Sequence, residues 1–242
     1  MDDWIYYLRK SLAKDKMGQA LNKNNMRLEE SLKIQSIIKK HKPFSNIINL
    51  GSGNVEQLKK TKPWVSKNVF DLFKKQKAKI LHVDAENFPG IDIVQDLSEP
   101  NALSFCDKLK GSKLFILANV LEHIPKKAHA EFLKKIYSKM KSKDGLMITV
   151  PYDYPYHADP IDTMYRPSSR DLQKLLPLTW LEGEIVNAGS YSEEFSKMST
   201  LKKIRKLLKP FWIFQKPSKW LENHRLFYLF KNYRITIVFG IK

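Results

Sequence analysis

The sequence predicts an α/β protein built around a mostly parallel β-sheet. Between Asn46 and Val150, short apolar runs alternate with segments whose apolar residues have helical spacing. Parallel strands that are covered by helices on both faces have this continuous apolar character. The 43% hydrophobic content is ordinary for a globular protein and suffices for one sizeable core.

Five apolar runs predict the strands of this sheet, and two helical segments connect some of them. The first helical segment spans Val55–Lys75, with Pro63 interrupting it, and the second runs from Lys126 to Met140. Each run is short enough for a strand and ends at polar or turn-forming residues. The predicted strands are Asn46–Gly51, Lys79–Ala85, Ile91–Asp96, Lys113–Asn119 and Leu146–Val150.

The two ends of the chain differ from this central pattern. Residues 1–44 predict an N-terminal helical cap, and residues 181–190 and 234–241 predict two further strands. One main domain is therefore expected over 45–242, with 191–233 as a basic, aromatic and helical insertion before the last strand. The apolar stripe of the cap consists of Leu28, Leu32, Ile34, Ile37 and Ile38.

Charge is the strongest bulk feature of the chain. The formal net charge is +18, and the stretch from Phe195 to Lys242 holds 12 Lys or Arg against the single acid Glu222. Such a field attracts nucleic acid, anionic lipid or an anionic substrate, and charge alone does not choose among them. The lone cysteine, Cys106, agrees with a reducing compartment, and no signal peptide is recognisable, so a cytoplasmic protein is expected.

Three successive strand ends carry residues suited to a ligand. Ligands of open parallel sheets bind beyond the carboxyl ends of the strands. Gly51 and Gly53 follow the first strand and let a ligand approach the backbone. Asp84 ends the second strand, where it can accept hydrogen bonds from ribose hydroxyls, and Asp96 ends the third, where it can meet an adenine amino group. The set predicts a cofactor that contains a nucleoside.

A nicotinamide dinucleotide fits this pattern poorly. Its fingerprint needs a third glycine at the start of the first helix and an acid about 20 residues further on. Val55 or Glu56 occupies the third position, and Asp84 lies 31 residues beyond Gly53. The Walker lysine motif is absent as well.

Five segments in consistent order resemble the class I S-adenosylmethionine-dependent methyltransferases. The similarity spans the region from Ile47 to Leu176. The Leu-Glu-His-Ile run and the strand that leads from glycine to Val-Pro make it more specific than a glycine loop alone. The segments are Ile48–Gly53, His82–Asp84, Asp96–Leu97, Ala118–Pro125 and Asp144–Pro151.

This resemblance implies a Rossmann-like fold, whose seven-stranded, mostly parallel sheet has an antiparallel last strand. It also implies S-adenosylmethionine as the cofactor. Gly51 and Gly53 would face its methionine part, and Asn119 would lie beside the sulfonium. The remaining cofactor-binding residues implied in this way are Asp84 and Ala85 for the ribose, Asp96 and Leu97 for the adenine, and Asn49 in the first strand.

Two positions depart from the pattern of the resembled family. The family usually has an acid where this chain has Asn49, and a small residue where it has Val55. Asparagine still forms hydrogen bonds, but it does not neutralise a cationic cofactor. Glu122 and His123 are open to two interpretations, as satisfied polar side chains at the start of a helix or as catalytic groups.

The loop after the fifth strand resembles the one found in methyltransferases associated with bacterial surface-glycan synthesis. His157 is the candidate general base, and Asp159 or Asp162 would orient it or bind substrate hydroxyls. Alternatively, Asp162 pairs with Arg166. A divalent metal is only weakly indicated by this spacing, and no metal site is predicted. The candidate substrate-binding residues are Tyr154, Tyr156 and Tyr165, for stacking on a sugar, and Arg166, for a phosphate or carboxylate.

The expected function is methyl transfer to an oxygen of a sugar or surface-glycan precursor, either a small molecule or a lipid-linked glycan. Residues 197–233 would bind an anionic membrane surface, at the inner face of the membrane, or form a pocket wall. One alternative is methylation of RNA or another nucleic acid, although no base-methylating motif follows the fourth strand. Another is a non-catalytic cofactor-binding or interaction protein. The apolar face of the insertion consists of Leu201, Ile204, Leu207 and Leu208.

Overall fold

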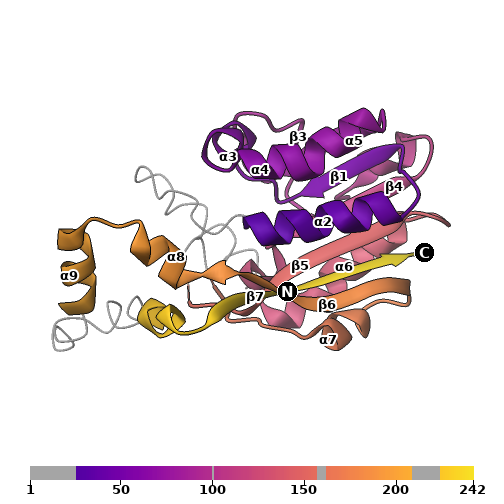
Figure 1. Cartoon of the computed structure of the whole chain (residues 1–242). Coiled ribbons are helices and arrows are strands. Elements are labelled where there is room, and N and C mark those ends of the chain that lie inside the picture. Colours follow the sequence, from indigo (N-terminus) through magenta and orange to yellow (C-terminus); the bar gives the residue numbers. More distant parts are fainter. Residues whose placement is uncertain (1–25, 100, 157–161, 209–223) are drawn as a thin grey trace.

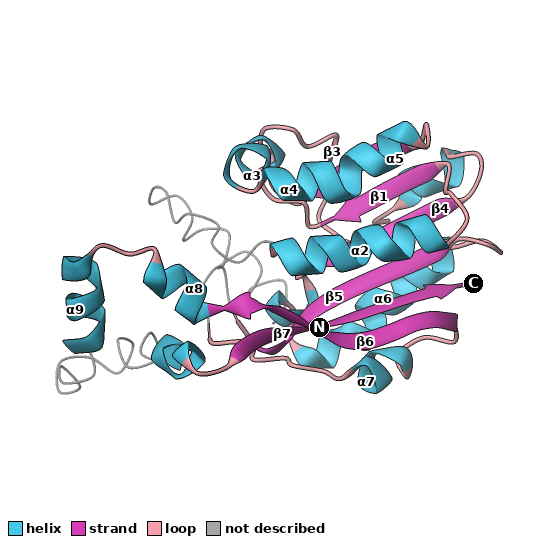
Figure 2. Ribbon diagram, in the orientation of Figure 1, coloured by secondary structure: helices cyan, strands magenta, loops and turns pink. Residues whose placement is uncertain are grey.

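The computed structural model describes residues 26–99, 101–156, 162–208 and 224–242. A seven-stranded sheet lies between helices on its two faces (Figures 1 and 2). The strand order is β3-β2-β1-β4-β5-β7-β6. The strands are β1 (Asn46–Leu50), β2 (Lys79–Asp84), β3 (Ile93–Val94), β4 (Lys113–Ala118), β5 (Gly145–Asp153), β6 (Thr179–Ser190) and β7 (Asn232–Ile241).

The expected Rossmann-like sheet is confirmed, including its antiparallel last strand. β1 to β5 pair in parallel, whereas β7 runs antiparallel to both β5 and β6. β3 is shorter than expected, because only Ile93 and Val94 of the predicted run pair with β2. The strand order reverses between β1 and β4, so the chain leaves these two neighbours in opposite directions. This is the position at which open α/β sheets form a crevice.

Helices cover both faces of the sheet, and the break expected at Pro63 is present. The helix ends at Thr61, and Pro63 starts the next one at the first helical position, where its missing N–H costs nothing. The helices are α2 (Leu28–Lys40), α3 (Val55–Thr61), α4 (Pro63–Val65), α5 (Asp71–Lys75), α6 (His129–Lys139), α7 (Ser169–Gln173), α8 (Tyr191–Ser196) and α9 (Thr200–Leu208), joined by the π-helical turn η1 (Ser66–Phe70) and the 3₁₀ turns η2 (Ser104–Lys108), η3 (Leu121–His123), η4 (Lys126–Ala128) and η6 (His224–Leu229).

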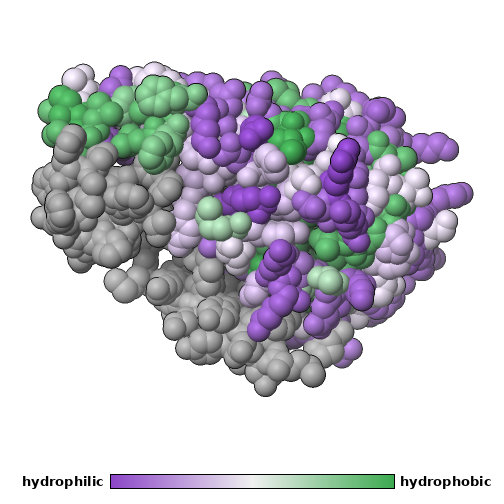
Figure 3. Space-filling view, turned by 90° about the horizontal axis from the view of Figure 1, so that it is seen from below, coloured by the Kyte–Doolittle hydropathy of each residue, from purple (hydrophilic) through white to green (hydrophobic). Residues whose placement is uncertain are grey.

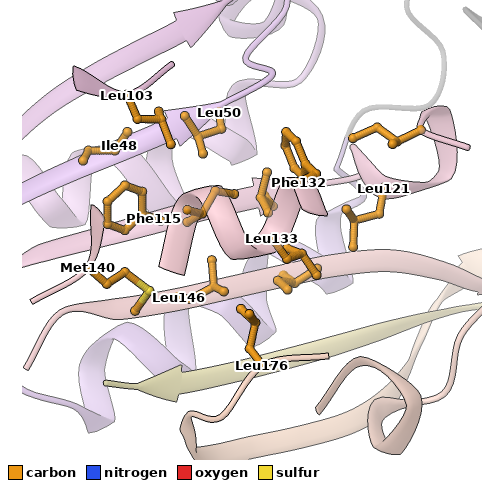
Figure 4. Packing of buried hydrophobic residues seen from close by; sticks show 14 of the residues in the cluster. Ile48, Leu50, Leu103, Phe115, Leu121, Phe132, Leu133, Met140, Leu146 and Leu176 are labelled. Atoms are coloured by element: carbon orange, nitrogen blue, oxygen red, sulfur yellow. The ribbon is translucent and has the colours of Figure 1, made fainter. Parts of the chain in front are cut away.

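Alternate residues of the central strands contribute their side chains to two separate hydrophobic cores, one on each face of the sheet. Ile48 and Phe115 lie on the face that α6 covers, where they belong to one buried cluster with Leu133 (Figure 4). Their chain neighbours Ile47 and Leu114 lie in the opposite cluster, together with residues of α2. Successive side chains of a strand point to opposite faces, so a strand that is buried on both faces must be apolar throughout.

The two predicted appendages lie at different places in the fold. The described part of the N-terminal segment is α2, which packs on the sheet with Ile34, Ile37 and Ile38 buried. α8 and α9 extend beyond the edge at which β1 ends (Figure 1). Residues 1–25 and 209–223 of these two segments lie outside the described residues.

A buried ion pair ties β4 to the start of β5 at the opposite edge of the sheet. Lys113 Nζ lies 3.2 Å from Asp144 Oδ2, with the two side chains 1% and 2% exposed. Asp144 also accepts hydrogen bonds from the backbone N–H groups of Lys113 (2.7 Å) and Lys141 (2.8 Å). The carboxylate thus compensates a buried ammonium and accepts hydrogen bonds from two backbone N–H groups.

Replacing Asp144 with alanine should lower the free energy of unfolding by about 3–5 kcal/mol, because it leaves the Lys113 charge buried without its partner. Urea denaturation of the purified protein measures this loss. The matched control is D107A, which breaks the solvent-exposed pair with Lys139 and should change stability little. Equal effects of D144A and D107A would contradict the role assigned to the buried pair.

Candidate functional site

The carboxyl ends of β2, β1, β4 and β5 meet at one edge of the sheet because these strands are parallel neighbours. Most of the ligand-binding residues expected from the sequence lie at this edge. Gly51 follows β1, Asp84 ends β2 and Asn119 follows β4. Residues that are far apart in the sequence therefore lie together at the carboxyl ends of β1 and β4.

The loop after β1 has a backbone that only glycine adopts readily. Gly51 has φ 67° and Gly53 has φ 60°, both in the left-handed region. A Cβ atom on Gly51 would lie 2.8 Å from Val120 Cγ2 of the loop after β4. The loop is fixed to β2 by three hydrogen bonds, from Gly51 N (2.9 Å) and Ser52 N (3.2 Å) to Val83 O and from Gly53 N to Asp84 Oδ2 (2.7 Å).

Both departures from the resembled family have local partners. Asn49 Nδ2 donates to Ser52 Oγ (2.9 Å) and lies 3.2 Å from His82 Nδ1, so Asn49 braces the glycine loop against β2. Val55 begins α3 and is buried against Gly90, where an added Cβ would lie 2.9 Å from Val55 Cβ. A glycine at position 90 thus makes room for the larger residue at position 55.

The acids at the ends of β2 and β3 accept hydrogen bonds from the backbone of the turns that follow them. Asp84 Oδ1 accepts a hydrogen bond from Glu86 N (3.1 Å), and burial raises the pKa of Asp84 although backbone hydrogen bonds oppose the rise. Asp96 Oδ1 accepts from Ser98 N (2.8 Å). Ala85 and Leu97, each beside one of these acids, are half-buried. All four lie where the sequence places the ribose and adenine, and their contacts with a cofactor remain a prediction.

Asn119 has a partner that the sequence did not reveal. It takes a left-handed backbone conformation with φ 56°, and its N–H donates to Thr149 O at 2.9 Å. Its side-chain Nδ2 donates to the carboxylate of Glu30 on α2, at 3.1 Å to Oε1 and 3.4 Å to Oε2. The signal available in the sequence was the spacing, since Glu30 lies four residues before Ile34 on the buried face of α2.

Glu30 is a fully buried carboxylate that is held by several donors. Its side chain also accepts from Thr149 Oγ1 (2.6 Å) and from Arg27 N (3.2 Å). Burial raises the pKa of Glu30, and the hydrogen bonds from Thr149, Arg27 and Asn119 oppose the rise. Nearby, burial lowers the pKa of Lys62 to about 8, although the charge of Glu30 favours the protonated amine.

The loop after β5 forms the expected ion pair. Arg166 binds Asp162 with two hydrogen bonds, Nη1 to Oδ1 at 3.0 Å and Nη2 to Oδ2 at 2.6 Å. The alternative in which Asp162 pairs with Arg166 is therefore confirmed. Thr163 fastens this loop to the turn after β4, because its N–H and its hydroxyl both donate to Glu122 O at 2.9 Å. The other predicted catalytic residues, His157 and Asp159, lie outside the described residues.

The tyrosines of this loop have different surroundings. The Tyr154 hydroxyl accepts a hydrogen bond from Arg27 Nη1 (3.4 Å), and its ring lies 4.6 Å from the Tyr233 ring. The Tyr165 ring packs 4.1 Å from the imidazole of His129, and Tyr156 is half-buried. Tyr165 thus uses one side of its ring for packing, and the substrate contacts of all three tyrosines remain predictions.

His129 is a structural residue that the sequence did not single out. It is 2% exposed, and its Nε2 lies 2.9 Å from Leu121 O and 2.8 Å from Ile124 O. It therefore closes the Leu-Glu-His-Ile turn after β4. Burial lowers its pKa, although these carbonyl groups favour the protonated ring.

Glu122, within that turn, has a carboxylate that is only partly satisfied. Its side chain is 1% exposed, and Oε2 has no hydrogen-bond partner in the described part of the chain. Oε1 lies 3.9 Å from His123 Nε2. Burial raises the pKa of Glu122 to about 8, and the charge of Arg166 opposes the rise. Within the described residues, Glu122 is therefore not a fully satisfied polar side chain, and a catalytic role for it stays a prediction.

Comparison with known proteins identifies the class of fold. No protein-family model matches the sequence, and no curated protein is significantly similar to it. Solved structures do match, and they have the Rossmann-like fold of S-adenosylmethionine-dependent methyltransferases. Identities of 12–14% show a common fold.

Three of these structures cover nearly the whole chain. 1,6-Didemethyltoxoflavin-N1-methyltransferase of Burkholderia thailandensis, bound to 1,6-didemethyltoxoflavin and S-adenosylhomocysteine, has a TM-score of 0.54 and 14% identity over 99% of this chain and 90% of its own. Coclaurine N-methyltransferase, bound to N-methylheliamine and S-adenosylhomocysteine, has a TM-score of 0.51 and 13% sequence identity. The match covers 98% of this chain and 81% of that structure's chain. A cyclopropane-fatty-acyl-phospholipid synthase-like protein of Lactobacillus casei has a TM-score of 0.50 and 12% sequence identity. The match covers the full length of both chains.

Replacing Glu122 with glutamine should flatten the pH dependence of stability. Between the ordinary pKa of 4.5 and the folded-state value of about 8, the folded protein keeps a proton that the unfolded chain has lost. Stability therefore falls as pH rises across this window, by at most about 1.4 kcal/mol per pH unit for one such group. E122Q has no such proton and should lack this component in urea denaturation between pH 5 and pH 8.

The control for this measurement is E131Q on α6, whose parent side chain is exposed. It should follow the wild-type pH profile. Parallel profiles for E122Q and wild type would show that Glu122 titrates in its ordinary range.

Proposed function

We propose that this protein is an S-adenosylmethionine-dependent methyltransferase. The observation that carries the proposal is the convergence of the left-handed glycine loop, Asp84 and Asn119 at the point where the strand order reverses. Similarly folded structures bound to S-adenosylhomocysteine support it. When bound, S-adenosylmethionine supplies an electrophilic methyl group on a positively charged sulfur.

The residues present fit this cofactor. Gly51 and Gly53 leave the backbone open to its methionine part. Asp84 keeps carboxylate lone pairs for ribose hydroxyls, since its backbone hydrogen bonds, from Gly53, Glu86 and Ala85, do not use all the lone pairs of its two oxygens. Asp96 and Leu97 would contact the adenine, and Asn119 would lie beside the sulfonium.

We propose an oxygen of a sugar or surface-glycan precursor as the methyl acceptor. His157 would take the proton of the acceptor hydroxyl as its oxygen bonds to the methyl carbon, and Asp159 would orient the imidazole. The pairing of Asp162 with Arg166 assigns Asp162 to holding that guanidinium. Tyr154 and Tyr156 would stack on the sugar.

Two unsatisfied polar atoms support an acceptor that carries hydroxyl groups. Arg166 Nε and Glu122 Oε2 are both buried without a hydrogen-bond partner among the described residues. One is a donor, and the other belongs to a carboxyl group that can donate when protonated and accept in either state. Because a hydroxyl group both donates and accepts, sugar hydroxyls match this pair.

A methyl-transfer screen against nucleotide sugars, lipid-linked glycans and RNA tests this proposal. Methylation of a glycan is expected, and H157A should lower kcat by about 100- to 10,000-fold, the usual worth of a general base, while cofactor affinity is kept. H41A, at the far end of α2 from Glu30, is the matched control and should keep kcat. Full turnover of H157A at saturating substrate would exclude His157 as the base, and RNA as the sole acceptor would contradict the glycan assignment.

We further propose that α9 lies on an anionic membrane surface, which suits a lipid-linked acceptor. Figure 3 shows hydrophobic residues gathered at the end of the molecule that carries α9 in Figure 1. Leu201 is 76% exposed, and Ile204, Leu207 and Leu208 are about half exposed. Four basic residues and no acid accompany them in α9. No helix in the described residues is long and apolar enough to cross a bilayer.

Vesicle sedimentation tests this membrane proposal. The protein should sediment with vesicles that contain phosphatidylglycerol and much less with pure phosphatidylcholine, because each basic residue near an anionic surface contributes about 1 kcal/mol. The pair Ile204→Gln and Leu208→Gln should weaken sedimentation, whereas Ile185→Gln on β6 should not. Equal sedimentation with both lipids, or an intact paired variant, would contradict the proposal.

A further inference from the structure

We propose that Glu30, on the helix before the first strand, is a positioning residue that makes Asn119 a binding group for the cationic centre of the methyl donor. This inference rests on the proposed function. It assigns to α2 a part in distinguishing the sulfonium cofactor from its demethylated, uncharged thioether product.

The geometry of Glu30 fixes the side chain of Asn119. Glu30 is 0% exposed, and its carboxylate receives Asn119 Nδ2, Thr149 Oγ1 and Arg27 N within 3.4 Å. Thr149 pairs in register with Ala118, the residue before Asn119. The carboxylate is therefore held from α2, β4 and β5 together and has little freedom to move.

Asn119, Thr149 and Arg27 all donate hydrogen bonds to the Glu30 carboxyl oxygens, so this group selects one orientation of the Asn119 amide. The Asn119 NH₂ group must face Glu30, which leaves Oδ1 on the other side of the amide. Asn119 then presents an acceptor oxygen on the side away from Glu30, beyond the carboxyl end of β4. Such an oxygen, backed by a carboxylate, attracts a positively charged group or a hydrogen-bond donor.

The charges of the site indicate why this acid matters. The first strand carries the neutral Asn49, whose Nδ2 is used by Ser52 and His82. Glu30 supplies from α2 a carboxylate at the same edge of the sheet. Its positive neighbours are Lys62, which interacts with it electrostatically, and Arg27, whose Nη1 is paired with Glu194 at 2.8 Å.

The test is a double-mutant cycle measured by titration calorimetry, with S-adenosylmethionine and S-adenosylhomocysteine as the two probes. E30Q should weaken binding of S-adenosylmethionine by about 10-fold, the middle of the range for directly coupled residues. The loss for S-adenosylhomocysteine should be clearly smaller, because that ligand lacks the sulfonium charge. N119A should weaken binding of the two ligands as E30Q does. The double variant should bind S-adenosylmethionine no more weakly than the single variant with the lower affinity.

Three further variants separate positioning from folding. E29Q, on the same turn of α2, should leave both affinities unchanged. T149V removes one hydrogen bond to Glu30 but keeps its charge, so it should lower thermal stability and preserve the preference for S-adenosylmethionine. E30D keeps the negative charge and should retain more of that preference than E30Q, even where both variants lose stability.

The possible outcomes are distinct. Additive losses in the cycle, or equal losses for the two ligands, would overturn the role of Glu30 and leave the proposed function intact. If wild-type protein binds neither ligand, the proposed function itself fails, and this inference fails with it.

Discussion

The pairing of β1 with β2 on one side and β4 on the other is the constraint on which the site depends. It places Asn49 beside His82 and Ile116 in adjacent strands, so the three strands end together. The glycine loop then leaves the sheet between Asp84 and Asn119. Gly51 passes so close to Val120 that a Cβ atom would collide with it, and its φ is in the left-handed region as well. The fold thus selects glycine at this position before any ligand does.

Buried charged groups have different partners at the two edges of the sheet. At the edge where β4 begins, Asp144 and Lys113 neutralise each other at 3.2 Å. At the edge where β4 ends, Glu30 and Glu122 are buried with raised pKa values, and Oε2 of Glu122 has no partner in the described residues. A protein pays for such a carboxylate in stability, and titratable groups perturbed in this way concentrate at functional sites. This asymmetry matches a stabilising role for the Asp144–Lys113 edge and the function proposed for the other edge.

Much of the fold was predictable because its signals are local. The apolar runs that became β1, β4 and β5 are continuous, and Pro63 divides the helical segment as its missing N–H requires. The ends of β1, β2 and β4 fall within one residue of the prediction, whereas β5 continues three residues beyond its predicted end, to Asp153. β6 begins at Thr179, two residues earlier than expected, where its pairing with the end of β7 is not visible in the sequence.

The polar partners of the site were less accessible to sequence reasoning. Glu30 meets Asn119 across 89 residues, and this contact depends on how α2 packs on the sheet. His129 closes its turn by contacts with backbone carbonyl groups. Such contacts do not depend on the side chains of the partners, so the sequence does not indicate them. Asp162 and Arg166, in contrast, are four residues apart, and their pairing was foreseen as an alternative. Local spacing is readable, whereas contacts made by tertiary packing are not.

Titration of the wild-type protein with S-adenosylmethionine in a calorimeter tests the central claim most directly. The account predicts saturable binding of one cofactor per chain, and it predicts that D84A weakens this binding by about 10- to 100-fold, the worth of hydrogen bonds to a charged group. D71N, on the exposed surface of α5, should bind as the wild type does. Absence of saturable binding by the folded wild-type protein would contradict the account.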